Sequence, residues 1–212
     1  LVTKDREGLT PLKQKFAHEQ EPQSTFLDAI GEVKPTAIVG CAAQAGSFNA
    51  YVLSAMARIN ERPIIFALSN PTSRSECTAR EAYTYTEGKC LFASGSPFPQ
   101  VEVNGKTFIP RQSNNSYVFP GIGLGLVVSS PRIVPQSVFL SAAEALSKIV
   151  SEDDLENGSL FPSLTKIREV SQSIAAAVAE QCFTAGVAGV PKPDDLSKAI
   201  QEAMYKPVYD RI

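Results

Sequence analysis

The sequence predicts an α/β fold, with part of a parallel sheet, helices on both of its faces, and a helical C-terminal region. Three observations predict it. Short apolar runs at residues 36–40, 63–68 and 90–97 each end in small or polar residues, as buried parallel strands do. Helical patterns separate these runs, which is typical of βαβ units. From residue 135 onward, apolar residues recur at helical spacing.

The composition excludes several classes of protein. The chain has 212 residues, of which 43% are hydrophobic and 20% charged, as in an ordinary globular protein. A net charge of −2 offers no general attraction to nucleic acid or to a membrane surface, so we expect neither partner. The 4 cysteines are scattered without a Cys/His cluster, which argues against a zinc site. They suit a reducing compartment, the cytoplasm or the mitochondrial matrix.

The first elements are a helix at residues 23–34 and the strand at 36–40. Ser24 or Thr25 can cap the helix, and Pro35 ends it. The loop after the strand, residues 40–47, consists mostly of small residues that let a ligand approach the backbone. A helix at 49–60 follows, and its first N–H groups would face an anion.

The second strand, residues 63–68, ends abruptly at Ser69-Asn70-Pro71. In an open α/β sheet, ligands bind beyond the carboxyl ends of the strands, so this ending places a hydroxyl and an amide at such a crevice. Pro71 biases Asn70 towards extended backbone. The alternative is that Asn70 only forms an Asx-type turn.

A helix at 78–88 with a capping box, Thr78 to Glu81, leads to the third strand. Asn104-Gly105 then predicts a hairpin within residues 100–110. Together these units describe a Rossmann-like sheet.

The glycines between Gly121 and Gly125 do not form a dinucleotide-binding loop. The fingerprint needs Gly-x-Gly-x-x-Gly after a strand, and both spacing and context differ here. Close contact between helices explains these glycines better. Further helices are expected at 136–150, at 163–184 and from Asp194 to Met204.

The polar groups at the strand ends suit binding rather than proton transfer. They are hydroxyls and amides, to which Asn114 and Asn115 add two more, and no Asp, Glu, Lys or His follows any of the three strands directly. Such a site can hold a nucleotide and orient a small polar substrate, but it lacks an acid, a base and a metal. A Rossmann-like interaction or regulatory module without enzymatic activity, or another nicotinamide-dependent dehydrogenase, remains an alternative.

Several motifs resemble those of malic enzymes. They are FALSNPT (66–72), ECTAREAYTYTEGKCLFASGSPF (76–98) and QSNNSYVFPG (112–121). FAHEQE (16–21) and LFPSLTKIREVS (160–171) extend the likeness along nearly the whole chain. The chain resembles the C-terminal portion of a malic enzyme, including part of its NAD(P)-binding domain.

The resemblance implies oxidative decarboxylation of malate to pyruvate and carbon dioxide, with NADP or NAD and with Mg²⁺ or Mn²⁺. It implies three substrate-binding amides, Asn70, Asn114 and Asn115. It implies cofactor contacts from Gly40, Cys41, Ala42, Ser69 and Asn70. Lys13 matches the position that favours NADP, and a cation there is sensible because the cofactor carries a 2′-phosphate.

The resemblance also implies what this chain does not carry. In the family, the catalytic tyrosine and lysine and the acidic metal ligands precede the matched part, so we expect no catalytic residue or metal ligand here and no activity of the isolated chain. The expected division is an NAD(P)-binding part at 1–114, a helical region at 115–187 that packs on the N-terminal part of the enzyme, and a tail at 188–212. A homo-oligomer, dimer or tetramer, is expected. Arg111, Ser113 and Gln44 depart from the family's usual residues.

Overall fold

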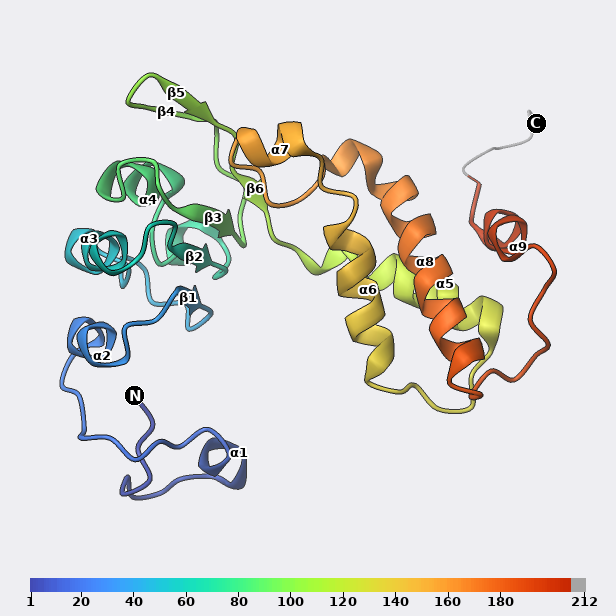
Figure 1. The fold of residues 1–212 in the computed structure, drawn as a ribbon, viewed down its shortest axis with the longest axis horizontal. Coiled ribbons are helices and arrows are strands. Elements are labelled where there is room, and N and C mark those ends of the chain that lie inside the picture. The colour runs from blue at the N-terminus through green and yellow to red at the C-terminus, as the bar shows by residue number, and fades with distance from the viewer. Residues whose placement is uncertain (207–212) are drawn as a thin grey trace. The chain divides into compact units, whose positions relative to one another are not determined.

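The computed structural model describes residues 1–206. The chain forms two compact units, Leu1–Pro110 and a second that begins at Arg111. Figure 1 labels the helices and strands of both units. The first unit is an α/β unit and the second is helical, as the sequence predicts.

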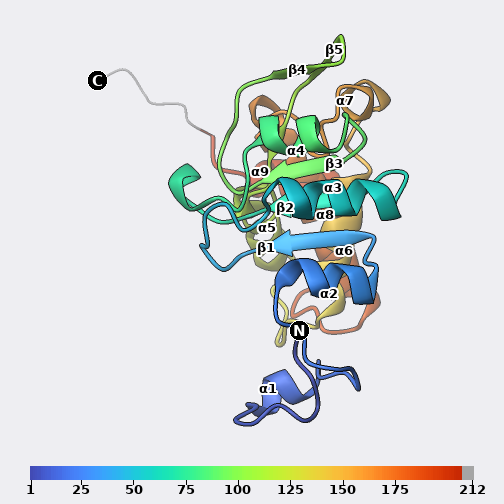
Figure 2. The same cartoon turned by 90° about the vertical axis from the view of Figure 1, so that its left-hand side faces the viewer.

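The first unit is built on three parallel strands. They are β1 (Ala37–Gly40), β2 (Ile64–Ala67) and β3 (Leu91–Ser94), adjacent in that order. Their last residues lie opposite one another, Gly40 beside Ala67 and Ala67 beside Ser94. Figure 2 shows β1 and β3 pointing the same way, and β2 pairs parallel to both. The segments that follow them therefore leave the sheet at one common edge.

Three helices cover one face of this sheet (Figures 1 and 2). They are α2 (Phe26–Val33), α3 (Ala50–Ile59) and α4 (Ala79–Tyr85), and capping boxes begin α2 and α4. Within this unit, these three helices supply the predicted helical cover on one face of the sheet. On the other face of β1, Ala37 is exposed and Val39 is 57% exposed.

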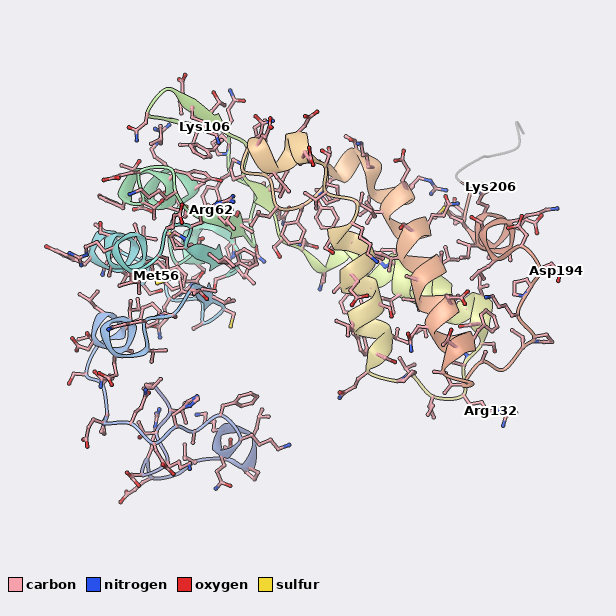
Figure 3. The ribbon with its side chains drawn as sticks, viewed as in Figure 1. Met56, Arg62, Lys106, Arg132, Asp194 and Lys206 are labelled. Carbon is pink, nitrogen blue, oxygen red and sulfur yellow. The ribbon has the colours of Figure 1, made fainter. Side chains whose placement is uncertain are left out.

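The core of the first unit lies between the sheet and these helices. Met56 of α3, labelled in Figure 3, is fully buried there, as are Tyr83 and Phe92. The predicted hairpin is confirmed as β4 (Val101–Val103) and β5 (Lys106–Phe108), with Asn104 and Gly105 both at positive φ. The hairpin brings the Phe108 ring to 4.2 Å from the Tyr83 ring, stacked upon it.

The N-terminal segment lies beyond the β1 edge and apart from the three strands (Figures 1 and 2). It holds the short helix α1 (Pro11–Gln14), which the sequence analysis did not predict, and Thr10 caps it. Thr3 and His18 pair in an isolated parallel bridge. A 3₁₀ turn, η1 (Thr72–Arg74), follows β2.

The second unit is a bundle around one long helix. Its elements are β6 (Arg111–Gln112), η2 (Asn115–Tyr117), α5 (Phe119–Ser129), α6 (Ser137–Ser147), α7 (Glu152–Glu156), η3 (Leu164–Lys166), α8 (Ile167–Thr184) and α9 (Leu196–Ala203). Helix α8 packs against α5, α6 and α9. Asp194, labelled in Figure 3, lies just before α9. Among residues 1–206, no helix has the length and apolar character that a membrane span requires.

Two glycines allow α5 and α8 to approach closely. A Cβ on Gly121 would lie 2.7 Å from Cβ of Ile174, and one on Gly125 would lie 2.8 Å from Cβ of Val178. The interpretation of these glycines as a helix contact is therefore confirmed.

Candidate functional site

The carboxyl ends of β1, β2 and β3 form an edge that gathers most of the predicted contact residues. The loop after β1 begins with Gly40, and β2 is followed by Ser69 and Asn70. Cys41, Ala42 and Asn70 are exposed, whereas Gly40 and Ser69 are buried. The edge therefore presents small exposed residues and an amide above a buried layer.

The Asn70 side chain is anchored by the neighbouring strand. Its Oδ1 accepts a hydrogen bond of 2.7 Å from Oγ of Ser96, which follows β3. This bond crosses to the next strand end, which favours a fixed amide over a local Asx-type turn. A Cβ on Gly95 would lie 2.1 Å from the Leu68 carbonyl oxygen and 3.0 Å from Asn70 Nδ2, so only glycine permits this approach.

The loop after β1 is held by three backbone N–H groups that donate to the segment following β2. Ala43 donates to Oγ of Ser69 at 2.9 Å, Gly46 to the carbonyl of Ser75 at 3.3 Å, and Phe48 to the carbonyl of Glu76 at 3.0 Å. Ala43 and Gly46 have positive φ, 55° and 72°. The loop is thus tightly turned and tied to the neighbouring crossover.

The expectation that the first N–H groups of helix α3 face an anion is wrong for two of them. Asn49 caps the helix, and its Oδ1 accepts from Tyr51 at 3.0 Å and from Val52 at 3.2 Å. Those donors are already satisfied within the chain.

Glu76 is a site residue that the sequence analysis missed. It is only 1% exposed, and it lies behind the ends of β1 and β2. The Ser69 hydroxyl donates to Oε1, and the Ser69 N–H donates to Oε2 at 3.3 Å. No carboxylate directly follows a strand in the sequence, as expected. In the folded protein, however, the Glu76 carboxylate lies at the ends of β1 and β2, so the expectation that this site lacks one is wrong. Glu76 stands in the segment before α4, and nothing in its spacing signals this contact.

Lys13 lies on α1, outside the group of residues at the sheet edge. Its side chain is exposed, and its N–H donates to Oγ1 of Thr10 at 3.3 Å. The role of Lys13 at a 2′-phosphate therefore stays a prediction.

Asn114 and Asn115 belong to the second unit. Oδ1 of Asn114 accepts from the Ser116 N–H at 2.9 Å and caps η2, while Asn115 is exposed. Asn70 belongs to the first unit, so shared contact of the three amides with one substrate stays a prediction. In the same unit as Asn114, a guanidinium nitrogen (Nη2) of Arg111 lies 3.9 Å from Oδ1 of Asp154.

The donor set of the described residues fits a polar organic ligand. Hydroxyls, an amide and small loop residues suit a ribose or a carboxamide. Within residues 1–206, no group of three or more His, Cys, Asp and Glu side chains could hold a metal ion. These residues therefore do not fit the divalent metal that the resemblance implies.

The chain is similar to malic enzymes throughout its length. It is 49% identical over 211 residues to the chloroplastic NADP-dependent malic enzyme of Zea mays. It is 46% identical over 213 residues to the mitochondrial NAD-dependent malic enzyme of Ascaris suum. These alignments cover 99% and 100% of the chain but 33% of each relative, so the chain spans about a third of their length.

Solved structures agree with this likeness. Malic enzyme from Pyrococcus horikoshii matches with a TM-score of 0.59 and 26% identity, over 79% of this chain and 34% of that one. The Entamoeba histolytica malic enzyme matches with a TM-score of 0.70 over 95% of this chain and 40% of that one, and at 21% identity it supports the fold alone. The family model described as malic enzyme, NAD binding domain, matches residues 1–183. With most of its length inside that match, the chain belongs to the malic enzyme NAD-binding domain family.

Proposed function

We propose that this chain is the cofactor-binding part of a malic enzyme that converts (S)-malate to pyruvate and carbon dioxide with NADP or NAD. The observation that carries the proposal is the sheet edge, where the anchored Asn70 amide lies on the segment that ties down the loop of small residues. Family membership supports the same reading.

Each residue of the edge has a binding or orienting role in this proposal. Gly40, Cys41 and Ala42 line the path of the cofactor, and Ser69 and Asn70 contact its nicotinamide ribose. Asn70, with Asn114 and Asn115, donates hydrogen bonds that orient malate. The cofactor, when bound, accepts the hydride that leaves the substrate. The described residues do not fit Mg²⁺ or Mn²⁺.

The partners and the domain division follow from the same proposal. The remaining N-terminal part of the enzyme supplies the acid, the base and the metal ligands. Residues 1–114 bind the cofactor, and residues 115–187 pack on that N-terminal part. The tail expected at 188–212 falls partly outside the described residues, which end at residue 206. The assembly is a homo-oligomer, dimer or tetramer. The named relatives are chloroplastic or mitochondrial, and for this protein we propose the cytoplasm or the mitochondrial matrix.

Binding of NADPH tests the function directly. Titration of the complete enzyme, followed by nucleotide fluorescence, should saturate and should weaken about tenfold with Asn70→Ala, the cost of a lost hydrogen bond to a bound ligand. Malate with Mn²⁺ should then drive NADP reduction. An interaction module would instead show neither NADP-dependent stabilisation nor any dependence on Asn70.

Cofactor choice tests the role of Lys13. Lys13→Gln removes a cation whose hydrogen bond to a phosphate is worth about 1.5–3 kcal/mol, so the KM for NADP should rise roughly tenfold or more. The KM for NAD, which lacks that phosphate, should change little. Lys15→Gln is the matched control, since Lys15 is also exposed and lies two residues away. Equal changes for both cofactors would reject the phosphate role.

A further inference from the structure

The buried carboxylate of Glu76 calls for a physical explanation. Both of its oxygens accept hydrogen bonds from Ser69, and the residue is 1% exposed. Burying a carboxylate carries a desolvation cost, and an apolar residue in its place is often as stabilising. Glu76 therefore has little advantage as packing alone, and its contacts indicate what else it does.

The carboxylate determines how the Ser69 hydroxyl is oriented. A serine hydroxyl has one proton to donate and two lone pairs to accept with. In Ser69 the proton goes to Glu76, so the lone pairs remain for the Ala43 N–H at 2.9 Å. Without a strong acceptor at position 76, the hydroxyl could rotate away, and the loop would lose this attachment.

The backbone leaves room for this arrangement at one residue. A Cβ on Gly40 would lie 2.4 Å from both Cγ and Cδ of Glu76. Any larger residue at the end of β1 would displace the carboxylate from Ser69. One connected group therefore comprises Gly40, Ala43, Ser69 and Glu76.

We propose that Glu76 is a positioning residue for the cofactor site: acting through Ser69, it holds the loop Cys41–Gly46 in the shape that receives the nucleotide. This inference rests on the proposed function, because it takes that loop to contact NADP. Glu76 itself is buried beneath the loop and is not required to touch the cofactor.

The first experiment compares Glu76→Gln with the wild type in the complete enzyme. Glutamine keeps the volume but replaces one acceptor oxygen by a donor, so the Ser69 hydroxyl or N–H loses its partner. The KM for NADP and the dissociation constant of NADPH should both rise about tenfold, the scale of one hydrogen bond to a charged group. The KM for malate should change less than about twofold, because the Asn70–Ser96 bond is untouched.

The control is Glu81→Gln, five residues further on. Glu81 is exposed and accepts from the Thr78 N–H in the capping box of α4, a position that glutamine also fills. It removes the same charge from the same segment, and NADPH binding should stay within about twofold of the wild type.

A double variant separates positioning from a general structural role. If Glu76 acts through Ser69, then Glu76→Gln and Ser69→Ala should not add, and the double variant should bind NADPH as weakly as the worse single variant. If the double variant instead lost NADPH affinity by the product of the two single losses, the proposal would be overturned. Should Glu76→Gln fail to fold, Ser69→Ala alone carries the test, and unchanged NADPH binding by that variant would also overturn it.

Hydrogen exchange distinguishes failure of this inference from failure of the proposed function. The Ala43 amide should exchange faster in Glu76→Gln whether or not the protein uses malate. A wild type that binds NADPH and turns over malate, together with a variant that is unchanged in affinity and exchange, overturns the positioning role alone. A wild type that neither binds NADPH nor reduces NADP overturns the proposed function.

Discussion

Glycine stands at close contacts in both units, and different groups fill the space that it leaves. In the first unit, Gly40 faces the Glu76 side chain and Gly95 faces the Leu68 carbonyl. In the second, Gly121 and Gly125 face side chains of α8. The same residue type therefore serves site geometry in the α/β unit and helix packing in the helical unit, and substitutions should separate the two uses.

Two buried tyrosines, one in each unit, differ in whether the hydroxyl has a hydrogen-bond partner. Tyr83 is fully buried in the first unit, and its hydroxyl has no hydrogen-bond partner in the part of the chain that the structure describes. Tyr117 is 1% exposed in the second unit, and its hydroxyl donates to the Pro162 carbonyl at 2.6 Å. Each ring stacks on a phenylalanine, Phe108 or Phe161. Burial raises the pKa of both hydroxyls.

The largest effect is expected where two helices meet. Gly125→Ala places a Cβ 2.7 Å from the Ala175 carbonyl oxygen, and the helices must separate. We expect a loss of about 1–3 kcal/mol in the free energy of unfolding, even though alanine favours helix by up to about 1 kcal/mol. Urea unfolding followed by circular dichroism measures it.

Gly123→Ala provides the control on the same helix. Apart from its chain neighbours and the backbone of its own helix, no described atom lies within 4 Å of its added Cβ, and the residue is exposed. It should gain up to about 1 kcal/mol from helix propensity. If both substitutions moved stability in the same direction, the packing account of α5 would fail.

A smaller loss of stability but a clear loss of binding is expected at the sheet edge. Gly40→Ala pushes the Glu76 carboxylate away from Ser69. NADPH affinity should fall about tenfold, while the free energy of unfolding drops by no more than about 2 kcal/mol. Gly31→Ala on α2 is the control, since no described atom beyond its chain neighbours and its own helix backbone lies within 4 Å of the added Cβ. Unchanged affinity in Gly40→Ala would contradict the link between packing and binding.

The smallest changes in the free energy of unfolding should come from removing the two tyrosine hydroxyls, and only one of the two removals should destabilise the protein. Tyr117→Phe leaves the Pro162 carbonyl without its donor and should cost about 1 kcal/mol. Tyr83→Phe removes a buried hydroxyl that lacks a partner and should be neutral or stabilising by about 1 kcal/mol. Differential scanning calorimetry measures the stability of both variants. Equal losses of stability would contradict the difference between the paired and the unpaired hydroxyl.

The sequence predicted what depends on local pattern. The apolar runs marked β1, β2 and β3, Asn104-Gly105 marked the hairpin, and the spacing of glycines in α5 pointed to a neighbouring helix. The level register of parallel strands then brought Gly40 and Asn70 to one edge. Pattern was sufficient here because each signal lies within a few residues of the element that it specifies.

The sequence did not reveal contacts between distant residues. Glu76 meets Ser69 and Gly40 only after the chain has turned through η1, and no periodicity carries that information. Helix α7 was also missed, although Ser151 and Asp154 form a capping box that could have marked it. At four residues, α1 is too short for periodicity to indicate.

The three ties that hold the loop after β1 also bear on the order in which the protein folds. Ser69, Ser75 and Glu76 lie after β2, so this loop cannot take its final shape until the following crossover is in place. In refolding, helical signal from α3 can therefore appear before the nucleotide site exists. Recovery of NADPH binding should lag behind recovery of ellipticity, and this delay would time the closing of the second crossover.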